Sequence, residues 1–388
     1  MPVYLRPRED RRLRGGHLWV FSNEILRIEG DHAPGDLVSV FTADDRPIGS
    51  GLYHPGSLIA VRMIGPIGTL LDIDWYRARI GRALRLRQRL YPGSTTYRLA
   101  HAESDALPGV VVDRFDTVCA VQIASTGMEL RRELLFDALM EIEGVTGVVE
   151  RNDTSLRGLE GLPQRVGLAR GQGPAQIIDD GVLRFRVDPL GGQKTGFYLD
   201  QRESRHAMRR YMAGARVLDL FCNSGGFALH ALSAKALSVV AVDSSMEALA
   251  ELETNRLLNA LGPIETRQAD VFDLLTEWKT GGKLFDVVIA DPPPFARSKK
   301  HVSAARRKYV DLFTGALSLL SDEGVAFLAT CSHHITRETF AEIVRESLFR
   351  SRRRGVILEE RSAPPDHPVH PMMPETRYLQ GVVVRLAG

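Results

Sequence analysis

From about residue 186 onward, short apolar runs alternate with longer stretches of helical periodicity. The apolar runs are rich in valine, leucine and isoleucine and read RVLDLF, SVVAVD, FDVVIAD and GVAFLATC. Such runs indicate strands that are buried on both faces, which is typical of a parallel sheet covered by helices. We therefore predict a doubly wound α/β domain over residues 186–388.

The first 185 residues carry different patterns. Between residues 17 and 65, short apolar runs are separated by turn residues such as Pro34-Gly35 and Pro55-Gly56, which predicts a small β barrel over residues 1–70. Residues 71–185 mix strand-like and helical runs, so we predict a middle α+β domain there. Three domains agree with a chain of 388 residues, which is too long for one ordinary core.

Features of the whole chain narrow the class of protein. No stretch reaches the roughly 18 uninterrupted apolar residues of a membrane span, and no apolar run follows the basic N-terminus as in a secretory signal. The three cysteines, Cys119, Cys222 and Cys331, do not have the spacing of a disulfide framework or a structural zinc site. We expect a cytoplasmic protein without a membrane partner.

In an open parallel sheet, the ligand lies beyond the carboxyl ends of the strands. The run RVLDLF leads into a turn with two adjacent glycines, Gly225 and Gly226, which let the backbone approach a ligand closely. SVVAVD ends in Asp243, which is placed to accept hydrogen bonds from both ribose hydroxyls of a nucleoside cofactor. The chain lacks the G-x-G-x-x-G pattern that a dinucleotide pyrophosphate requires, so a cofactor without phosphate fits better.

The order Asp219, Gly225-Gly226, Asp243, Asp270 and Asp291 resembles the class I methyltransferases, which use S-adenosylmethionine. Within that class, four features resemble the ribosomal-RNA cytosine methyltransferases that carry a PUA domain: DPPPF at 291–295, TCS at 330–332, GQKTGFYLDQR at 192–202, and the N-terminal PGDLVSV and GSGLYHPGS. The resemblance covers nearly the whole chain. It implies a PUA barrel that binds RNA, a middle domain that positions RNA, and a Rossmann-like catalytic domain with a mostly parallel seven-stranded sheet.

This resemblance also implies the ligands. The product would be 5-methylcytosine in the 23S RNA of the large ribosomal subunit. A homodimer is one expected oligomeric state. The residues expected to hold S-adenosylmethionine are Tyr198, Gln201, Phe221, Asn223, Ser224, Gly225, Asp243, Ser244, Asp270, Val271 and Asp291.

The expected chemistry depends on a thiol. Carbon 5 of cytosine is a poor nucleophile, so enzymes of this family add a cysteine thiolate to carbon 6, which makes carbon 5 electron-rich. The resemblance implies that Cys331 is this nucleophile and that Asp291 contacts the base edge or the cofactor amino group. The family commonly has lysine where this chain has Pro294, so the role of that lysine is not carried over.

Three basic stretches predict contact with RNA phosphates. One is the arginine-rich amphipathic helix predicted over 74–90, with arginines at 77, 79, 82, 85, 87 and 89. A single charge run is often only a solvated face, but three together favour RNA. From the other two stretches, we select Arg6, Arg11, Arg14, Arg297, Lys299, Lys300, Arg306, Arg307 and Lys308.

Two other functions remain open at this point. A methyltransferase acting on an exocyclic nitrogen of guanine or adenine would need no covalent cysteine. An RNA-binding protein of ribosome assembly could retain the cofactor fold without catalysis. His333-His334 and the segment around His367 lack the cysteine or carboxylate spacing of a metal site, so we expect no metal.

Overall fold

The computed structural model describes residues 2–192, 195–296 and 299–387 of the chain. They form two compact units. Unit 1 contains Met1–Ile178, Val187–Leu199 and Pro365–Thr376, and unit 2 contains Asp179–Arg186, Asp200–Pro364 and Arg377–Gly388. The domain boundaries predicted at residues 70 and 185 stay predictions.

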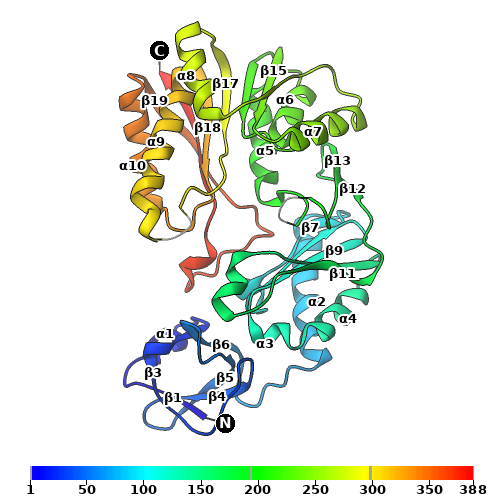
Figure 1. Ribbon diagram of the computed structural model, residues 1–388, viewed down its shortest axis with the longest axis vertical. Helices are drawn as coiled ribbons and strands as arrows, with labels where there is room; N and C mark the ends of the chain where they lie inside the picture. Colours follow the sequence, from blue (N-terminus) through cyan, green and yellow to red (C-terminus); the bar gives the residue numbers. More distant parts are fainter. Residues whose placement is uncertain (1, 193–194, 297–298, 388) are drawn as a thin grey trace. The chain divides into compact units, whose positions relative to one another are not determined.

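The N-terminal part of unit 1 is a six-stranded sheet that curls around its own core, drawn in blue in Figure 1. The strand order is β2-β6-β5-β4-β1-β3, and the core contains Val3, Val20, Val40 and Val61. The elements are β1 (Pro2–Leu5), α1 (Arg11–Arg14), β2 (Trp19–Phe21), β3 (Ile25–Ile28), β4 (Leu37–Phe41), β5 (Pro47–Tyr53) and β6 (Ile59–Gly65).

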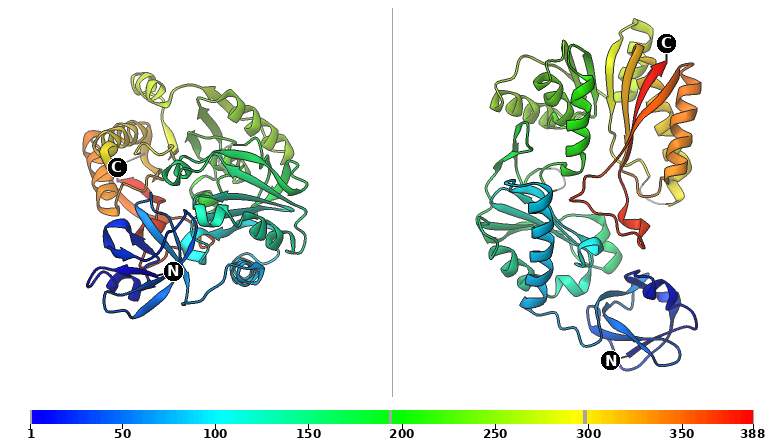
Figure 2. Two further views of the ribbon diagram at one scale, coloured as in Figure 1. Left: turned by 60° about the horizontal axis from the view of Figure 1, so that its bottom comes forward. Right: turned by 180° about the vertical axis from the view of Figure 1, so that it is seen from behind.

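The middle part of unit 1 is a five-stranded sheet with the order β11-β10-β9-β8-β7. The helices α2 and α4 pack against each other and share one core with this sheet (Figure 2). The elements are α2 (Ile73–Leu90), β7 (Thr96–His101), β8 (Val110–Phe115), β9 (Val118–Ile123), α3 (Thr126–Glu129), α4 (Arg132–Met140), β10 (Gly147–Asn152) and β11 (Arg165–Gly171). A separate two-stranded sheet follows, made of β12 (Gln176–Asp179) and β13 (Arg184–Val187).

Unit 2 is built on a seven-stranded sheet with the order β16-β15-β14-β17-β18-β20-β19. The first five strands in this order are parallel, whereas β20 runs antiparallel to both of its neighbours. The strands are β14 (Arg216–Leu220), β15 (Ser238–Asp243), β16 (Glu265–Gln268), β17 (Phe285–Ala290), β18 (Leu320–Thr330), β19 (Arg354–Ser362) and β20 (Gln380–Ala387). The predicted doubly wound, mostly parallel sheet is confirmed.

Helices cover the seven-stranded sheet in two layers. The helix α6 contacts α5 and α7, and the helix α9 contacts α8 and α10 (Figure 1). Their bounds are α5 (Arg202–Met208), α6 (Gly226–Ser233), α7 (Met246–Leu258), α8 (Val271–Gly281), α9 (Val302–Ser318) and α10 (Arg337–Arg350). Within the described ranges, no helix is long and apolar enough to cross a membrane.

The strand order determines where a ligand can bind. From β14 the chain proceeds to β15 and β16 on one side, and then returns to β17 and β18 on the other. The neighbouring strands β14 and β17 therefore mark the point where the order reverses. Ligands of open α/β sheets bind beyond the carboxyl ends of the strands at this point.

Candidate functional site

The loop after β14 is a tight turn at the carboxyl end of the sheet. Phe221 and Asn223 have positive φ angles of 62° and 48°, and Gly225 follows with a φ of 87°. A Cβ atom at Gly225 would lie 2.6 Å from Cγ of Leu252, so both the backbone conformation and the packing require glycine there. The turn directs the chain into α6.

Asp243 joins the first two strand-end loops. One carboxylate oxygen accepts the N–H of Asn223 over 2.9 Å, and the other accepts the N–H of Ser245 over 3.0 Å. Each oxygen has a second lone-pair direction that can accept a further hydrogen bond. The half-buried carboxylate is therefore held in place with capacity left for a ligand hydroxyl.

Asp270 has a structural role besides its predicted one. It is the N-cap of α8, and its Oδ1 accepts the N–H groups of Phe272 and Asp273 over 2.8 and 3.3 Å. The next residue, Val271, is buried in the core of unit 2. Ser244 is exposed on the loop after β15, where its carbonyl accepts Nε2 of Gln268 over 3.2 Å. Contact of these residues with a cofactor stays a prediction.

Asp219 is the buried acid of the site. The carboxylate lies inside β14 and accepts the N–H of Ala228, at the start of α6, over 2.8 Å. Burial raises the pKa of Asp219 to about 8, with the nearby Asp291 and Asp243 carboxylates acting in the same direction against the Ala228 N–H. Asp219 therefore stays largely protonated at neutral pH and stabilises the start of α6.

This shifted pKa predicts a dependence of stability on pH. The folded pKa lies above the unfolded value of about 3.9, so the contribution of Asp219 to the stability of the wild type should fall as the pH rises from about 4 to about 8, by up to about 1.4 kcal/mol per pH unit. Asp219→Asn should lack this loss, so its melting temperature relative to wild type should rise between these pH values. The control Asp322→Asn removes an exposed carboxylate. Parallel melting profiles for wild type and Asp219→Asn would contradict the assignment.

The loops after β17 and β18 bring Asp291 and Cys331 to neighbouring positions of the sheet edge. The two strands pair in parallel, with Ala290 opposite Leu328. Sγ of Cys331 lies 3.8 Å from the carbonyl oxygen of Pro292, the residue that follows Asp291. Cys331 is partly exposed, whereas Cys119 and Cys222 are buried.

Tyr309 on α9 ties these two loops together. Its hydroxyl lies 2.8 Å from Oγ of Ser332 and 3.5 Å from the N–H of Phe295, which donates to it. Oγ of Ser332 also accepts the N–H of Ala296 over 3.4 Å. Tyr309 is fully buried, and burial raises the pKa of its hydroxyl. No motif in the sequence indicates this residue, because its role arises only when α9 packs behind both loops.

Two buried side chains of α5 and its N-terminal turn complete the site. Gln201 is 3% exposed, and in the described part of the chain neither Nε2 nor Oε1 of its amide has a hydrogen-bond partner. A ligand with its own donors and acceptors would satisfy this amide. The guanidinium of Arg205 packs against Gly226, where a Cβ atom would lie 2.7 Å from Nε. Tyr198 belongs to unit 1, so its predicted cofactor contact stays a prediction.

The predicted basic residues divide into paired and unpaired ones. Arg14 pairs with Asp10 over 2.5 Å, and Arg306 pairs with Glu346 over 2.8 Å. Arg297 and the side chain of Lys299 lie outside the described residues. The remaining predicted residues, Arg6, Arg11, Lys300, Arg307 and Lys308, are exposed.

Comparison with known proteins identifies the family of this chain. Residues 3–65 match the PUA-like domains, and residues 172–367 match the S-adenosylmethionine-dependent methyltransferases. This chain belongs to the S-adenosylmethionine-dependent methyltransferases. The family assignment confirms the predicted cofactor, the class of enzyme and the PUA-like domain.

Two relatives that align with nearly the full length of this chain have the same name. Ribosomal RNA large subunit methyltransferase I of Aeromonas hydrophila is 38% identical over 99% of this methyltransferase and 98% of the relative. The protein of the same name from Photobacterium profundum is 38% identical over 98% of each chain. Among solved structures, SMU.776 in complex with SAH covers 99% of this chain and 100% of its own, with a TM-score of 0.87 and 20% identity. That structure supports the fold.

The residues of unit 2 fit S-adenosylmethionine. The Asp243 carboxylate can accept hydroxyl groups, and the buried amide of Gln201 lacks partners within the described residues. When bound, S-adenosylmethionine supplies an electrophilic methyl group on a sulfonium. The partly exposed thiol of Cys331 lies at the same edge of the sheet.

Proposed function

We propose that this methyltransferase forms 5-methylcytosine in the 23S RNA of the large ribosomal subunit. The observation that carries the proposal is the position of Cys331. It is the partly exposed one of the three cysteines, and its sulfur lies beside the loop that begins with Asp291. The names of the full-length relatives support large-subunit ribosomal RNA as the substrate.

In the proposed reaction, the thiolate of Cys331 adds to carbon 6 of the target cytosine. This addition breaks the aromatic system and makes carbon 5 nucleophilic enough to be methylated. The proton on carbon 5 then leaves with its bonding pair retained by the ring, and the thiolate is expelled from carbon 6 as the double bond reforms. Asp291 would select cytosine by accepting a hydrogen bond from its exocyclic amine.

The experiment that tests this function compares ribosomal RNA from cells with and without the gene. Bisulfite sequencing of 23S RNA should show one cytosine that is methylated at carbon 5 only when the gene is present. Purified enzyme and S-adenosylmethionine should restore that methyl group on RNA from the deletion strain. An unchanged map of 5-methylcytosine, or a new methyl group on a base nitrogen, would refute the proposal.

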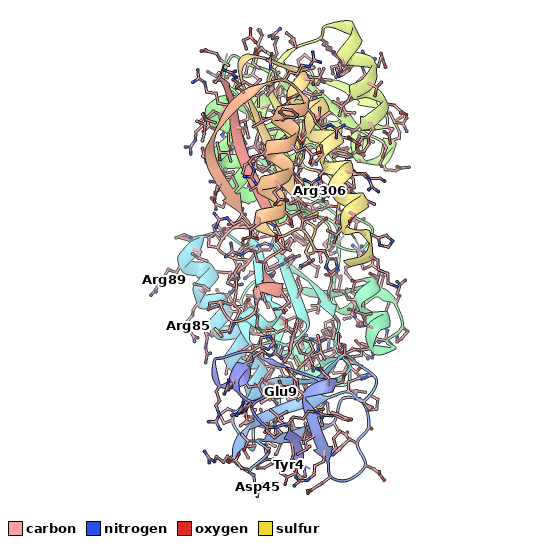
Figure 3. All side chains as sticks on the ribbon, turned by 90° about the vertical axis from the view of Figure 1, so that its left-hand side faces the viewer. Tyr4, Glu9, Asp45, Arg85, Arg89 and Arg306 are labelled. Carbon is pink, nitrogen blue, oxygen red and sulfur yellow. The ribbon has the colours of Figure 1, made fainter. Side chains whose placement is uncertain are left out.

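The long helix α2 contributes part of the proposed RNA surface. Arg87 is buried and pairs with Asp105 over 2.6 Å, and Arg77 pairs with Glu141 over 2.6 Å. By contrast, Arg82, Arg85 and Arg89 are exposed, and within the described residues none of them forms an ion pair. Their spacing of three and four residues places them along one stripe of the helix, and Figure 3 shows Arg85 and Arg89 projecting outward.

Replacing Arg82, Arg85 and Arg89 together with alanine should weaken RNA binding. Each arginine that contacts a phosphate adds about 0.7 to the slope of log affinity against log salt for single-stranded RNA, so the slope should fall by about 2. Fluorescence anisotropy over a series of salt concentrations measures this slope.

The matched control for this triple variant is Arg186, Arg267 and Arg385 to alanine. It removes the same charge from exposed arginines that already pair with Glu251, Glu265 and Glu323. The control should keep the wild-type slope. Equal slopes for both triple variants would show that the α2 stripe is only a solvated face.

Two further features stay proposals. The enzyme would act in the cytoplasm, where ribosomal RNA is assembled into subunits, and cell fractionation tests this location. A homodimer is the proposed oligomeric state, and sedimentation equilibrium of the full chain tests it.

A further inference from the structure

Three metal-ligating side chains meet in unit 2 away from the proposed nucleophile. Asp180 lies in the turn between β12 and β13, His206 lies on α5, and His230 lies on α6. One potential ligand atom from each side chain lies within 4.8 Å of the other two. Two imidazoles and a carboxylate are a common ligand set for zinc and neighbouring divalent transition metals.

The distances within this cluster are close to those of a zinc site. Oδ2 of Asp180 lies 2.8 Å from Nε2 of His230, and Oδ1 lies 3.7 Å from Nε2 of His206. With bonds of about 2.0–2.1 Å, two ligand atoms in a tetrahedral zinc site lie roughly 3.3 Å apart. These two distances involve different oxygens of Asp180, and the three ligand atoms lie within 4.8 Å of one another, so side-chain movements of about an ångström would bring the set to zinc geometry.

Protein hydrogen bonds satisfy only part of the cluster. Oδ1 of Asp180 accepts the N–H groups of Val182 and Leu183 over 3.0 and 2.9 Å, which orients the carboxylate. The 3.7 Å gap to His206 is too long for a hydrogen bond, and in the described part of the chain Nε2 of His206 is buried without a partner. A cation between the two side chains would satisfy both atoms.

The burial of the three side chains suits a structural ion with access to solvent. The side chains of Asp180 and His230 are 1% and 0% exposed, whereas that of His206 is 29% exposed. Because Nε2 of His206 is itself buried, this partly exposed ring would turn to admit the ion, which would keep water as its fourth ligand. Nδ1 of His230 would carry the ring proton while Nε2 binds the metal. The Arg205 cation also interacts with Asp180, so we expect moderate affinity.

We propose that Asp180, His206 and His230 form a site for a divalent transition metal, with zinc as the probe, that links the β12–β13 turn to α5 and α6. The proposal departs from the expectation of no metal, because residues so far apart in the sequence show no ligand spacing. It does not depend on the proposed reaction. The ion would hold α6 and Arg205 in place behind the glycine turn.

The test uses the full chain with Cys331→Ala, so that this thiol cannot bind zinc, after removal of metals with a chelator. Competition with a chromophoric chelator should show one bound Zn²⁺ per chain, and zinc should raise the melting temperature. Co²⁺ in the same site should show the visible absorption of a tetrahedral complex.

Two variants and a control decide the outcome. His206→Gln should weaken zinc binding by at least about 100-fold and abolish the rise in melting temperature, because it removes a ligand itself. Asp180→Asn should do the same while keeping the shape of the side chain, and His54→Gln should change neither readout. If the parent chain binds no equivalent of zinc, or if His206→Gln binds it as tightly as the parent, the cluster is only a hydrogen-bonded one and the proposal is wrong.

Discussion

Cys331→Ala should lower the rate of cytosine methylation by at least about 1,000-fold while leaving S-adenosylmethionine binding unchanged. The physical reason is that carbon 5 becomes nucleophilic only after a thiolate has added to carbon 6. Transfer of a labelled methyl group to 23S RNA under single-turnover conditions measures the rate, and calorimetry measures cofactor binding. Undiminished methylation of carbon 5 would eliminate Cys331 as the nucleophile.

A trapping experiment with the same variant tests the covalent step directly. RNA with 5-fluorocytosine at the target position should form a complex with wild-type enzyme that resists denaturant, because fluorine cannot leave carbon 5 as a cation. Cys331→Ala should form none. Cys119→Ala is the control, since it removes a buried thiol from β9 of unit 1 and should retain trapping and activity.

Asp243→Ala should weaken S-adenosylmethionine binding by about 100-fold or more. Hydrogen bonds to a charged group contribute about 1.5–3 kcal/mol each, and the carboxylate is proposed to accept two ribose hydroxyls. The variant also frees the N–H groups of Asn223 and Ser245, which Asp243 accepts in the folded protein. Isothermal titration calorimetry with S-adenosylmethionine measures the loss.

The control for this variant is Asp273→Ala, which removes an exposed carboxylate from the first turn of α8. It should bind the cofactor as the wild type does. Asp243→Asn should fall between the two, because the amide keeps one acceptor oxygen but loses the charge. Wild-type affinity in Asp243→Ala would mean that the ribose is held elsewhere.

The fold of the catalytic half was predictable because its signals are local. Strands buried on both faces need unbroken apolar runs, and a turn residue with a left-handed backbone favours glycine, as at Gly225 with its φ of 87°. For the same reason, the acids at the strand ends, such as Asp243 and Asp291, could be selected before the sheet order was known.

The tertiary structure decided which of these side chains are free to act. Six arginines of α2 look alike in the sequence, but packing pairs Arg87 with Asp105 and leaves Arg85 exposed. Likewise, Asp270 caps α8, and its contact with a cofactor stays a prediction. The burial and ion pairing of a side chain depend on residues distant in the chain, so they cannot be predicted from a local sequence pattern.

The sequence by itself determined the four apolar strands β14, β15, β17 and β18 and the acids at their ends, because these follow from local periodicity and turn chemistry, whereas the exposed strand β16, with the sequence ETRQ, carries no such signal. The meeting of Tyr309 with Ser332, and of Asp180 with His206 and His230, was decided only in three dimensions. Each of these contacts joins segments that the chain separates by more than twenty residues. Such contacts form when helices pack on a sheet. The local sequence does not indicate which side chains this packing brings together.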